Sequence, residues 1–188
     1  IPVVVYDACV LFPAPLRDFL LRLGQADLVR FHWSAAILEE CFGNLLLKRK
    51  DLSGDALQRT RQTMEAFFPA AMVTDYEQHI PHIQLPDPKD RHVVAAAIQI
   101  QASAIITFNL RDFPASALSS FGLVALHPDD FVTGRIESHS GRILEVLGQQ
   151  AATLKKPPAT VEDILARLRD NGLLRTAALL AMARGQSF

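Results

Sequence analysis

Four acidic residues stand at places in the sequence that suggest chemistry. Asp7 directly follows the apolar stretch VVVY, where a buried carboxylate without a partner would be costly. Glu40 lies in AAILEECFGNLL, Asp90 in LPDPKDRHVVAAA and Asp112 in TFNLRDFP. Carboxylates that lie close together repel one another and need protons or a cation. Mg²⁺ and Mn²⁺ prefer oxygen ligands, and a bound ion can generate hydroxide and stabilise charge on a phosphoryl group. An acid-only site with no nucleophile triad therefore predicts metal-dependent phosphodiester hydrolysis.

Most of these acids also have a simpler structural interpretation. Asp87 before Pro88 is a good helix N-cap, and Asp90, three residues later, would then be a capping-box acid. Asp112 could cap a following short helix, and Glu40 alone could be a partly exposed surface acid. The acid that follows VVVY is the hardest to explain in this way, and the joint occurrence of all four favours a common site.

Strands alternate with helices as far as about residue 130. Apolar and β-branched runs predict strands over residues 2–6, 27–33, 70–75, 104–108 and 122–126. Helical spacing and capping residues predict helices over residues 13–24, 35–50, 54–68 and 88–103 and a short one ending near 121. This order favours an α/β fold with a mainly parallel central sheet and helices on both faces. Active sites in such sheets lie at the carboxyl ends of the strands, where Asp7 and the loop with Asn109 and Asp112 fall.

The pattern changes from about residue 131 onward. Three helices are predicted over residues 140–154, 160–172 and 173–185, the second with Thr160 and Asp163 as a capping box. We therefore expect a domain over residues 1–130 and a small helical extension over residues 131–188.

Composition sets limits on the function. The net charge is −1, so there is no bulk attraction to nucleic acid and any such site needs a local basic patch or a metal. Two cysteines do not make a disulfide scaffold, which favours the cytoplasm. No secretory leader is evident, and no apolar run reaches the roughly 18 residues that span a bilayer.

Four motifs in this order, VVVYDACVLF, ILEECFGNL, LPDPKDRHVVAAAI and AIITFNLRDFP, resemble the PIN-domain nucleases. The likeness covers residues 2 to 130 and is greatest to the VapC-type ribonuclease toxins of bacterial toxin–antitoxin pairs. It implies a PIN-like three-layer α/β fold and three or four acids around Mg²⁺ or Mn²⁺. Matched position by position, these metal ligands and catalytic residues are Asp7, Glu40, Asp90 and Asp112, with Asn109 as a polar residue near the site.

The resemblance also implies partners. The substrate would be RNA, a cognate antitoxin protein would inhibit the enzyme, and a homodimer is expected; no membrane is implied. Arg91 and Arg111, each beside a predicted metal ligand, are candidates for phosphate contact. Cys9 departs from the family, in which Ser, Thr or Asn is common at this position. It could line the cleft or be a small buried apolar residue.

Other classes of protein fit less well. A haloacid-dehalogenase-like phosphatase needs a second acid two residues after the first, and Cys9 occupies that place. A receiver domain wants an acid pair after the first strand, and a dinucleotide-binding fold wants a glycine-rich first turn. A PIN-like module that binds a partner without catalysis stays an alternative, although acids at all four places argue against it.

Overall fold

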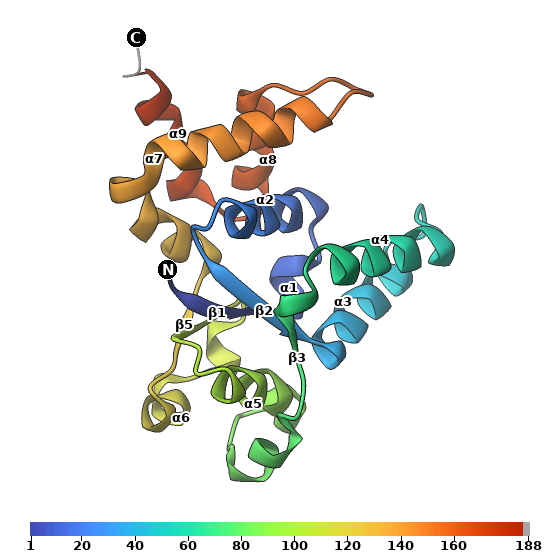
Figure 1. Cartoon of the computed structure of the whole chain (residues 1–188), viewed down its shortest axis with the longest axis vertical. Helices are drawn as coiled ribbons and strands as arrows, with labels where there is room; N and C mark the ends of the chain where they lie inside the picture. The colour runs from blue at the N-terminus through green and yellow to red at the C-terminus, as the bar shows by residue number, and fades with distance from the viewer. Residues whose placement is uncertain (186–188) are drawn as a thin grey trace. The chain divides into compact units, whose positions relative to one another are not determined.

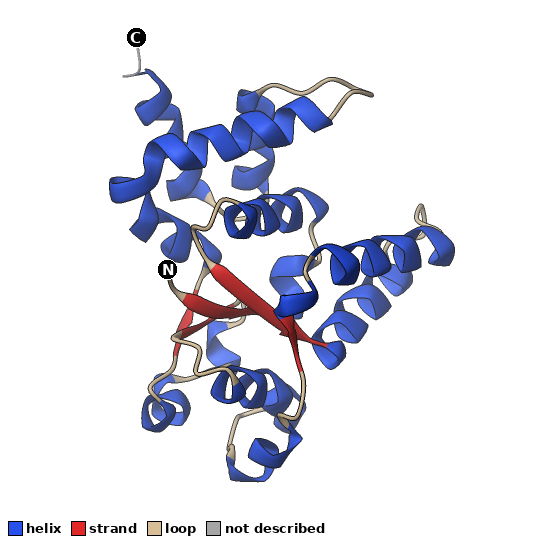
Figure 2. Ribbon diagram, viewed as in Figure 1, coloured by secondary structure: helices blue, strands red, loops and turns tan. Residues whose placement is uncertain are grey.

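The structure is a computed structural model of the chain, and it describes residues 1 to 185. Its centre is a five-stranded parallel sheet in the order β3-β2-β1-β4-β5 (Figures 1 and 2). The strands are β1 (Val3–Tyr6), β2 (Arg30–Ser34), β3 (Met72–Val73), β4 (Ala104–Ile106) and β5 (Val124–Leu126). The predicted α/β fold with a parallel sheet is confirmed.

The helices follow the strands in alternation as far as β5. They are α1 (Ala8–Leu11), α2 (Ala14–Gln25), α3 (Ala35–Lys48), α4 (Gly54–Phe67), α5 (Arg91–Gln99), α6 (Ala115–Leu118), α7 (Pro128–Thr153), α8 (Val161–Asp170) and α9 (Leu174–Gly185). Short 3₁₀ turns are η1 (Pro69–Ala71), η2 (Glu77–His82), η3 (Pro88–Asp90), η4 (Leu110–Asp112) and η5 (Ser119–Phe121). None of the described helices is both long and apolar enough to cross a membrane.

The contacts divide the chain into two compact units that do not follow chain order. The sheet unit contains Ile1–Phe12 and Arg30–Leu126, and the helical unit contains Pro13–Val29 and the chain from His127 onward. Within the sheet unit, α5 and α6 lie on the opposite side of the sheet from α3 and α4 (Figure 1). The predicted domain boundary at residue 130 stays a prediction.

The core of the sheet unit explains why its central strands are apolar throughout. Residues 4–6 of β1 and 104–106 of β4 are buried, as strands covered on both faces should be. Residues 93–97 of α5 are buried, and this helix contacts both strands. Phe31 of β2 stacks on Tyr6 at 5.2 Å between ring centroids. These contacts fix the ends of β1 and β4, from which the site residues project.

The direction of the strand order reverses between β1 and β4. The chain runs outward from β1 to β2 and β3, then returns to β4 on the other side of β1. Ligands bind at such reversal points, beyond the carboxyl ends of the strands. Tyr6 pairs with Ile106, so Asp7 and Thr107 are the next residues of the two neighbouring strands. The sheet therefore brings residues 100 positions apart side by side.

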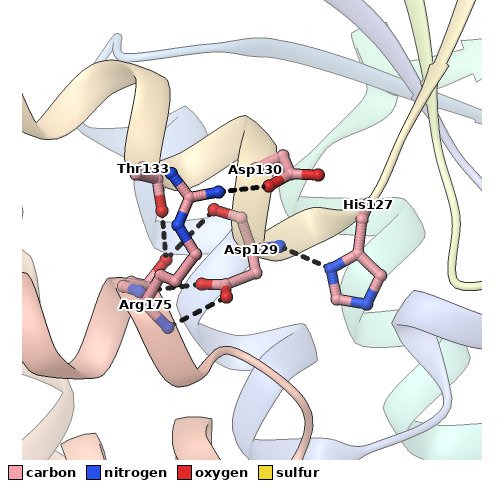
Figure 3. Close-up of polar contacts among 6 residues, drawn as sticks. His127, Asp129, Asp130, Thr133 and Arg175 are labelled. Atoms are coloured by element: carbon pink, nitrogen blue, oxygen red, sulfur yellow. Dashed lines mark hydrogen bonds and ion pairs between the residues drawn. The ribbon is translucent and has the colours of Figure 1, made fainter.

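The helical unit is a bundle of α2, α7, α8 and α9. Its α7 contacts the other three helices, and a buried carboxylate joins α7 to α9. Asp129 of α7 accepts hydrogen bonds from the backbone N–H groups of Arg175 and Thr176, at 2.9 and 2.8 Å (Figure 3). The guanidinium of Arg175 pairs with Asp130 at 2.7 Å. The capping box of Thr160 and Asp163 at the start of α8 is confirmed.

Several predicted boundaries are wrong. The strand expected over residues 27–33 begins only at Arg30, because Asp27 has a left-handed backbone with φ of 54°. The helix expected over residues 140–154 is present as the second part of α7, which follows a kink at His139 with φ of −137° and ψ of 17°; the first part of α7, which starts at Pro128, was not predicted. The helix expected over residues 88–103 is a 3₁₀ turn followed by α5, which ends at Gln99.

Candidate active site

Asp7 stands directly after β1 and is held by groups from two chain segments. It is only 6% exposed. One carboxylate oxygen accepts the backbone N–H of Ala8 at 2.8 Å, which makes Asp7 the N-cap of α1. The other accepts the hydroxyl of Thr107 at 2.7 Å and the thiol of Cys9 at 3.2 Å. The predicted place of Asp7 at the end of a buried strand is therefore correct, and a hydroxyl and a thiol fix its orientation.

Electrostatics make the charged form of Asp7 costly. Burial raises the pKa of Asp7 above its ordinary value of 3.8, and the negative charge of Glu40 raises it further. The hydrogen bonds from Thr107, Cys9 and Ala8 lower the pKa, but they compensate for burial only in part. A cation beside Asp7 would supply the missing compensation.

Asp90 lies within electrostatic reach of the other acids. Its pKa is raised to about 6, first by burial and then by the negative charges of Asp7, Asp112, Asp87 and Glu40. These residues come from four separate chain segments. Their charges act on one carboxyl group only because the fold brings them into the same electrostatic neighbourhood.

A family model described as "PIN domain" matches residues 3–111. The chain belongs to the PIN-domain family. A second family model, described as "VapC50 C-terminal domain", matches residues 128–181. A Mycobacterium tuberculosis (strain ATCC 25618 / H37Rv) protein named "Putative ribonuclease VapC50" is 38% identical over 77 residues, which are 41% of this chain and 46% of that protein. The match thus spans about half the length of this relative. No solved structure matches the chain.

Glu40 opens onto a pocket of the PIN domain. Its side chain on α3 is 46% exposed and lies 3.7 Å from Nε2 of His92 on α5. The pocket has a volume of about 690 Å³ and is lined by Ala35, Ala36, Glu39, Glu40, Asn44, Asp87, Lys89, Asp90 and His92. Two predicted ligands, Glu40 and Asp90, therefore share one opening with an imidazole and an ammonium group.

Asp112 and Asn109 lie in the loop after β4, close to the support of Asp7. Asp112 ends η4, and Asn109 precedes that turn. The backbone N–H of Asn109 donates to the hydroxyl oxygen of Thr107 at 3.0 Å, and this hydroxyl in turn holds Asp7. The negative charge of Asp112 is one of the causes that raise the pKa of Asp90. The β4 loop is thereby tied to Asp7 through Thr107.

The capping interpretations have different outcomes. Asp87 is an N-cap, because its carboxylate accepts the backbone N–H of Lys89 at 2.9 Å and Pro88 follows it. Asp90 precedes α5 but makes no side-chain capping hydrogen bond. The short helix after Asp112 has Pro114 as its N-cap residue, with no side-chain capping bond. Capping therefore explains Asp87 but neither Asp90 nor Asp112.

The acids suit a hard divalent ion in type and charge. Residues 1 to 185 contain no group of three or more His, Cys, Asp and Glu side chains already placed to hold a metal ion. Mg²⁺ commonly binds through one or two carboxylates, several waters and substrate phosphate, so it does not need such a cage. The buried carboxylate of Asp7 and the raised pKa of Asp90 are the features that a cation would relieve.

Reasoning from the sequence missed some pocket residues. Asn44 and His92 line the pocket but were not predicted as site residues. Asn44 lies one helical turn beyond Glu40, so the spacing of four could have indicated it. Nothing in the local sequence indicates His92, because its neighbour Glu40 is 52 positions away and only the fold brings the two together.

Proposed function

We propose that this PIN-domain chain is a metal-dependent endoribonuclease, the toxin of a type II toxin–antitoxin pair. Asp7, Glu40, Asp90 and Asp112 would form its catalytic metal site. The raised pKa of Asp90 carries this proposal, because it reports acids from separate segments around one carboxyl group. The family match and the name of the M. tuberculosis relative support RNA as the substrate.

The proposed cofactor is Mg²⁺ or Mn²⁺, held directly or through water by the four acids. When bound, such an ion lowers the pKa of a coordinated water and neutralises charge that develops on the phosphate. Thr107, Cys9 and the N–H of Ala8 keep the carboxylate of Asp7 in one orientation. Asn109 supports this arrangement by donating its backbone N–H to Thr107.

Cations beside the acids would hold the RNA backbone. Lys89 lines the pocket with Glu40 and Asp90. Arg91 starts α5 directly after Asp90, and its Nε is buried without a hydrogen-bond partner among the described residues. Arg111 directly precedes Asp112 in η4. We assign phosphate contacts to Arg91 and Arg111, because one guanidinium group can donate two parallel hydrogen bonds to the oxygens of a phosphate.

The toxin assignment brings further partners and a location. A cognate antitoxin protein would inhibit the chain by covering the acidic pocket, and a homodimer is the expected assembly. The compartment would be the cytoplasm, where the RNA substrate is found. The match of residues 128–181 to the VapC50 C-terminal domain supports a relationship that extends beyond the PIN domain.

Cleavage of RNA by an acid variant tests the proposal. We would incubate the chain with total RNA in the presence of Mn²⁺, Mg²⁺ or EDTA, beside Asp7→Asn. Asp55→Asn is the matched control, because Asp55 is an exposed acid in the first turn of α4. Cleavage should depend on the divalent ion, persist in Asp55→Asn and fall by more than about 100-fold in Asp7→Asn.

Full activity of Asp7→Asn would contradict the assignment of the site. Activity that survives EDTA would contradict the metal dependence. A chain that folds and binds Mn²⁺ but cleaves no RNA would favour the alternative of a PIN-like module that binds without catalysis.

A further inference from the structure

We propose that His92 is a positioning residue that fixes the carboxylate of Glu40 for the divalent ion. This inference rests on the proposed function, because it concerns the same metal site. Glu40 on α3 is nearly half exposed, whereas the side chain of His92 on α5 is only 18% exposed. A half-exposed glutamate has several rotamers open to it, and ordering it for a ligand costs conformational entropy. A largely buried ring beside it reduces that freedom.

The geometry of the imidazole suits this role. Its Nε2 lies 3.7 Å from a carboxylate oxygen of Glu40, and both residues line the same pocket. Its Nδ1 is buried and has no hydrogen-bond partner among the described residues. A tautomer with the proton on Nε2 directs the N–H toward Glu40 and leaves only a lone pair on the buried side. In this tautomer the ring has a single hydrogen-bond donor, the N–H at Nε2, and Glu40 is the acidic residue that lies next to it.

The separation of 3.7 Å is longer than a hydrogen bond. It closes when the carboxylate turns into the pocket, and the N–H then holds the oxygen that does not face the ion. Hydrogen bonds of this kind behind a ligand orient it, and their loss typically lowers metal affinity by about 10- to 100-fold.

The placement also links two parts of the site. Asp90 directly precedes α5, and His92 is the second residue of that helix. The start of α5 thus carries one proposed ligand and the residue that orients a second ligand on α3. Asp87 stabilises this segment by capping η3 through Lys89. Glu40 gains a fixed position relative to Asp90 although no sequence neighbour connects them.

Calorimetric titration of the full chain with Mn²⁺ at constant pH tests the inference. The wild type, His92→Ala, His92→Leu and His92→Gln are compared, and circular dichroism checks that each variant folds. Leucine keeps buried volume without a donor, and glutamine places an amide N–H near the position of Nε2. We expect the Kd for Mn²⁺ to rise at least about 10-fold in the alanine and leucine variants and by less than about threefold in His92→Gln.

A matched control and a double mutant separate positioning from general damage. His79 lies in η2 of the same unit, bonded through Nε2 to Gln99 at 2.8 Å, so His79→Ala should leave the Kd unchanged. In a Glu40→Gln background, His92→Ala should cause no further loss, because the two residues act as one unit. Independent losses that multiply would overturn the inference.

The failures of the two proposals are distinguishable. If the wild type binds Mn²⁺ and a folded His92→Leu variant binds it equally well, the role of His92 is wrong and the metal site stands. If the wild type itself binds no Mn²⁺, the metal-dependent function is overturned and the inference falls with it.

Discussion

The two units each bury one aspartate to the same extent and treat it in opposite ways. Asp7 in the sheet unit and Asp129 in the helical unit are both 6% exposed. The pKa of Asp7 is raised above its ordinary value, whereas the pKa of Asp129 is lowered. Burial raises the pKa of both carboxyl groups, and the groups around each one differ in how far they offset it.

Asp129 is surrounded by donors at the start of a helix. Burial by itself would raise its pKa, but hydrogen bonds from Thr176 and Arg175 lower it by more in total. Both backbone N–H groups belong to the first turn of α9, where the helix dipole also favours negative charge (Figure 3). The charge of Asp129 is thus compensated within the chain, which is typical of a structural residue.

Asp7 also accepts hydrogen bonds, but the negative charge of a neighbouring acid opposes its ionisation. Its one backbone donor, one hydroxyl and one thiol do not balance burial and the charge of Glu40. A buried carboxylate whose charge is compensated only in part is a feature of functional sites. In the helical unit, Asp129 joins α7 to α9. In the sheet unit, the charge of Asp7 is compensated only in part, which is the property that the proposed metal site requires.

Removal of Asp129 should produce the largest change in stability. Asp129→Ala removes the acceptor of the buried N–H of Thr176 and of the partly buried N–H of Arg175, so we expect a loss of about 2 to 3 kcal/mol in the free energy of unfolding. That corresponds to roughly 4 to 12 °C in Tm for a chain of this size. Thermal unfolding followed by circular dichroism measures it, and Mn²⁺ binding should be unchanged.

Asp130→Ala is the matched control, because Asp130 is exposed and pairs with the exposed side chain of Arg175. It should cost less than about 1 kcal/mol. Because the folded pKa of Asp129 is depressed, its contribution is present above the ordinary pKa of 3.8 and is lost as pH falls through the folded value. Equal Tm losses in the two variants would contradict the assigned role of Asp129.

Neutralising Asp90 should have a smaller effect of the opposite sign. Its folded pKa of about 6 lies above the ordinary value of 3.8, so ionisation destabilises the fold at neutral pH. Without metal at pH 7.5, we expect Asp90→Asn to raise stability by about 1 kcal/mol, after allowing for solvent screening, which is about 2 to 4 °C in Tm.

This gain should grow between pH 3.8 and about 6 and vanish below pH 3.8, where the carboxyl group is protonated in both states. Saturating Mn²⁺ should reverse the order, because only the wild type keeps the ligand. Thermal melts across pH, with and without Mn²⁺, measure both effects. A variant less stable than the wild type at pH 7.5 without metal would show that Asp90 is a structural acid like Asp129.

The smallest expected effect concerns the thiols. Burial, followed by the charge of Asp7, raises the pKa of Cys9 to about 12, and Cys41 is fully buried. Neither thiol should react with iodoacetamide at pH 8 in the folded chain, since the thiolate is the reactive form. Mass spectrometry should show no label on the folded protein and two labels in denaturant. Rapid labelling of Cys9 in the folded protein would show that the support of Asp7 opens readily.

The sequence predicts those parts of the molecule that depend on local patterns. The strands β1 and β4, the helices α3 and α4 and the capping box of α8 follow from residue types at short spacing. The helix α1 escaped prediction because its four apolar residues continue the apolar run of β1, and Asp7 both ends the strand and caps the helix.

Long-range relationships could not be predicted in the same way. The association of residues 13–29 with the helices after residue 127 depends on contacts across more than 100 positions, such as the bond from Gln150 to the carbonyl of Pro15. The part of α7 before His139, from Pro128 onward, was not predicted, whereas the predicted helix from residue 140 follows the kink at His139. Of the candidate site, the acids could be predicted and Cys9 was considered as a residue of the cleft, but the hydrogen bonds by which Cys9 and Thr107 hold Asp7 could not be predicted.

Calorimetric titration of Mn²⁺ into the wild type, Asp7→Asn and Asp129→Asn at pH 7.5 tests the central claim most directly. If the buried acid of the PIN domain awaits a cation and that of the helical unit does not, Mn²⁺ should bind to the wild type and to folded Asp129→Asn but not to Asp7→Asn. Equal binding to the wild type and Asp7→Asn, or no binding to the wild type, would contradict the account.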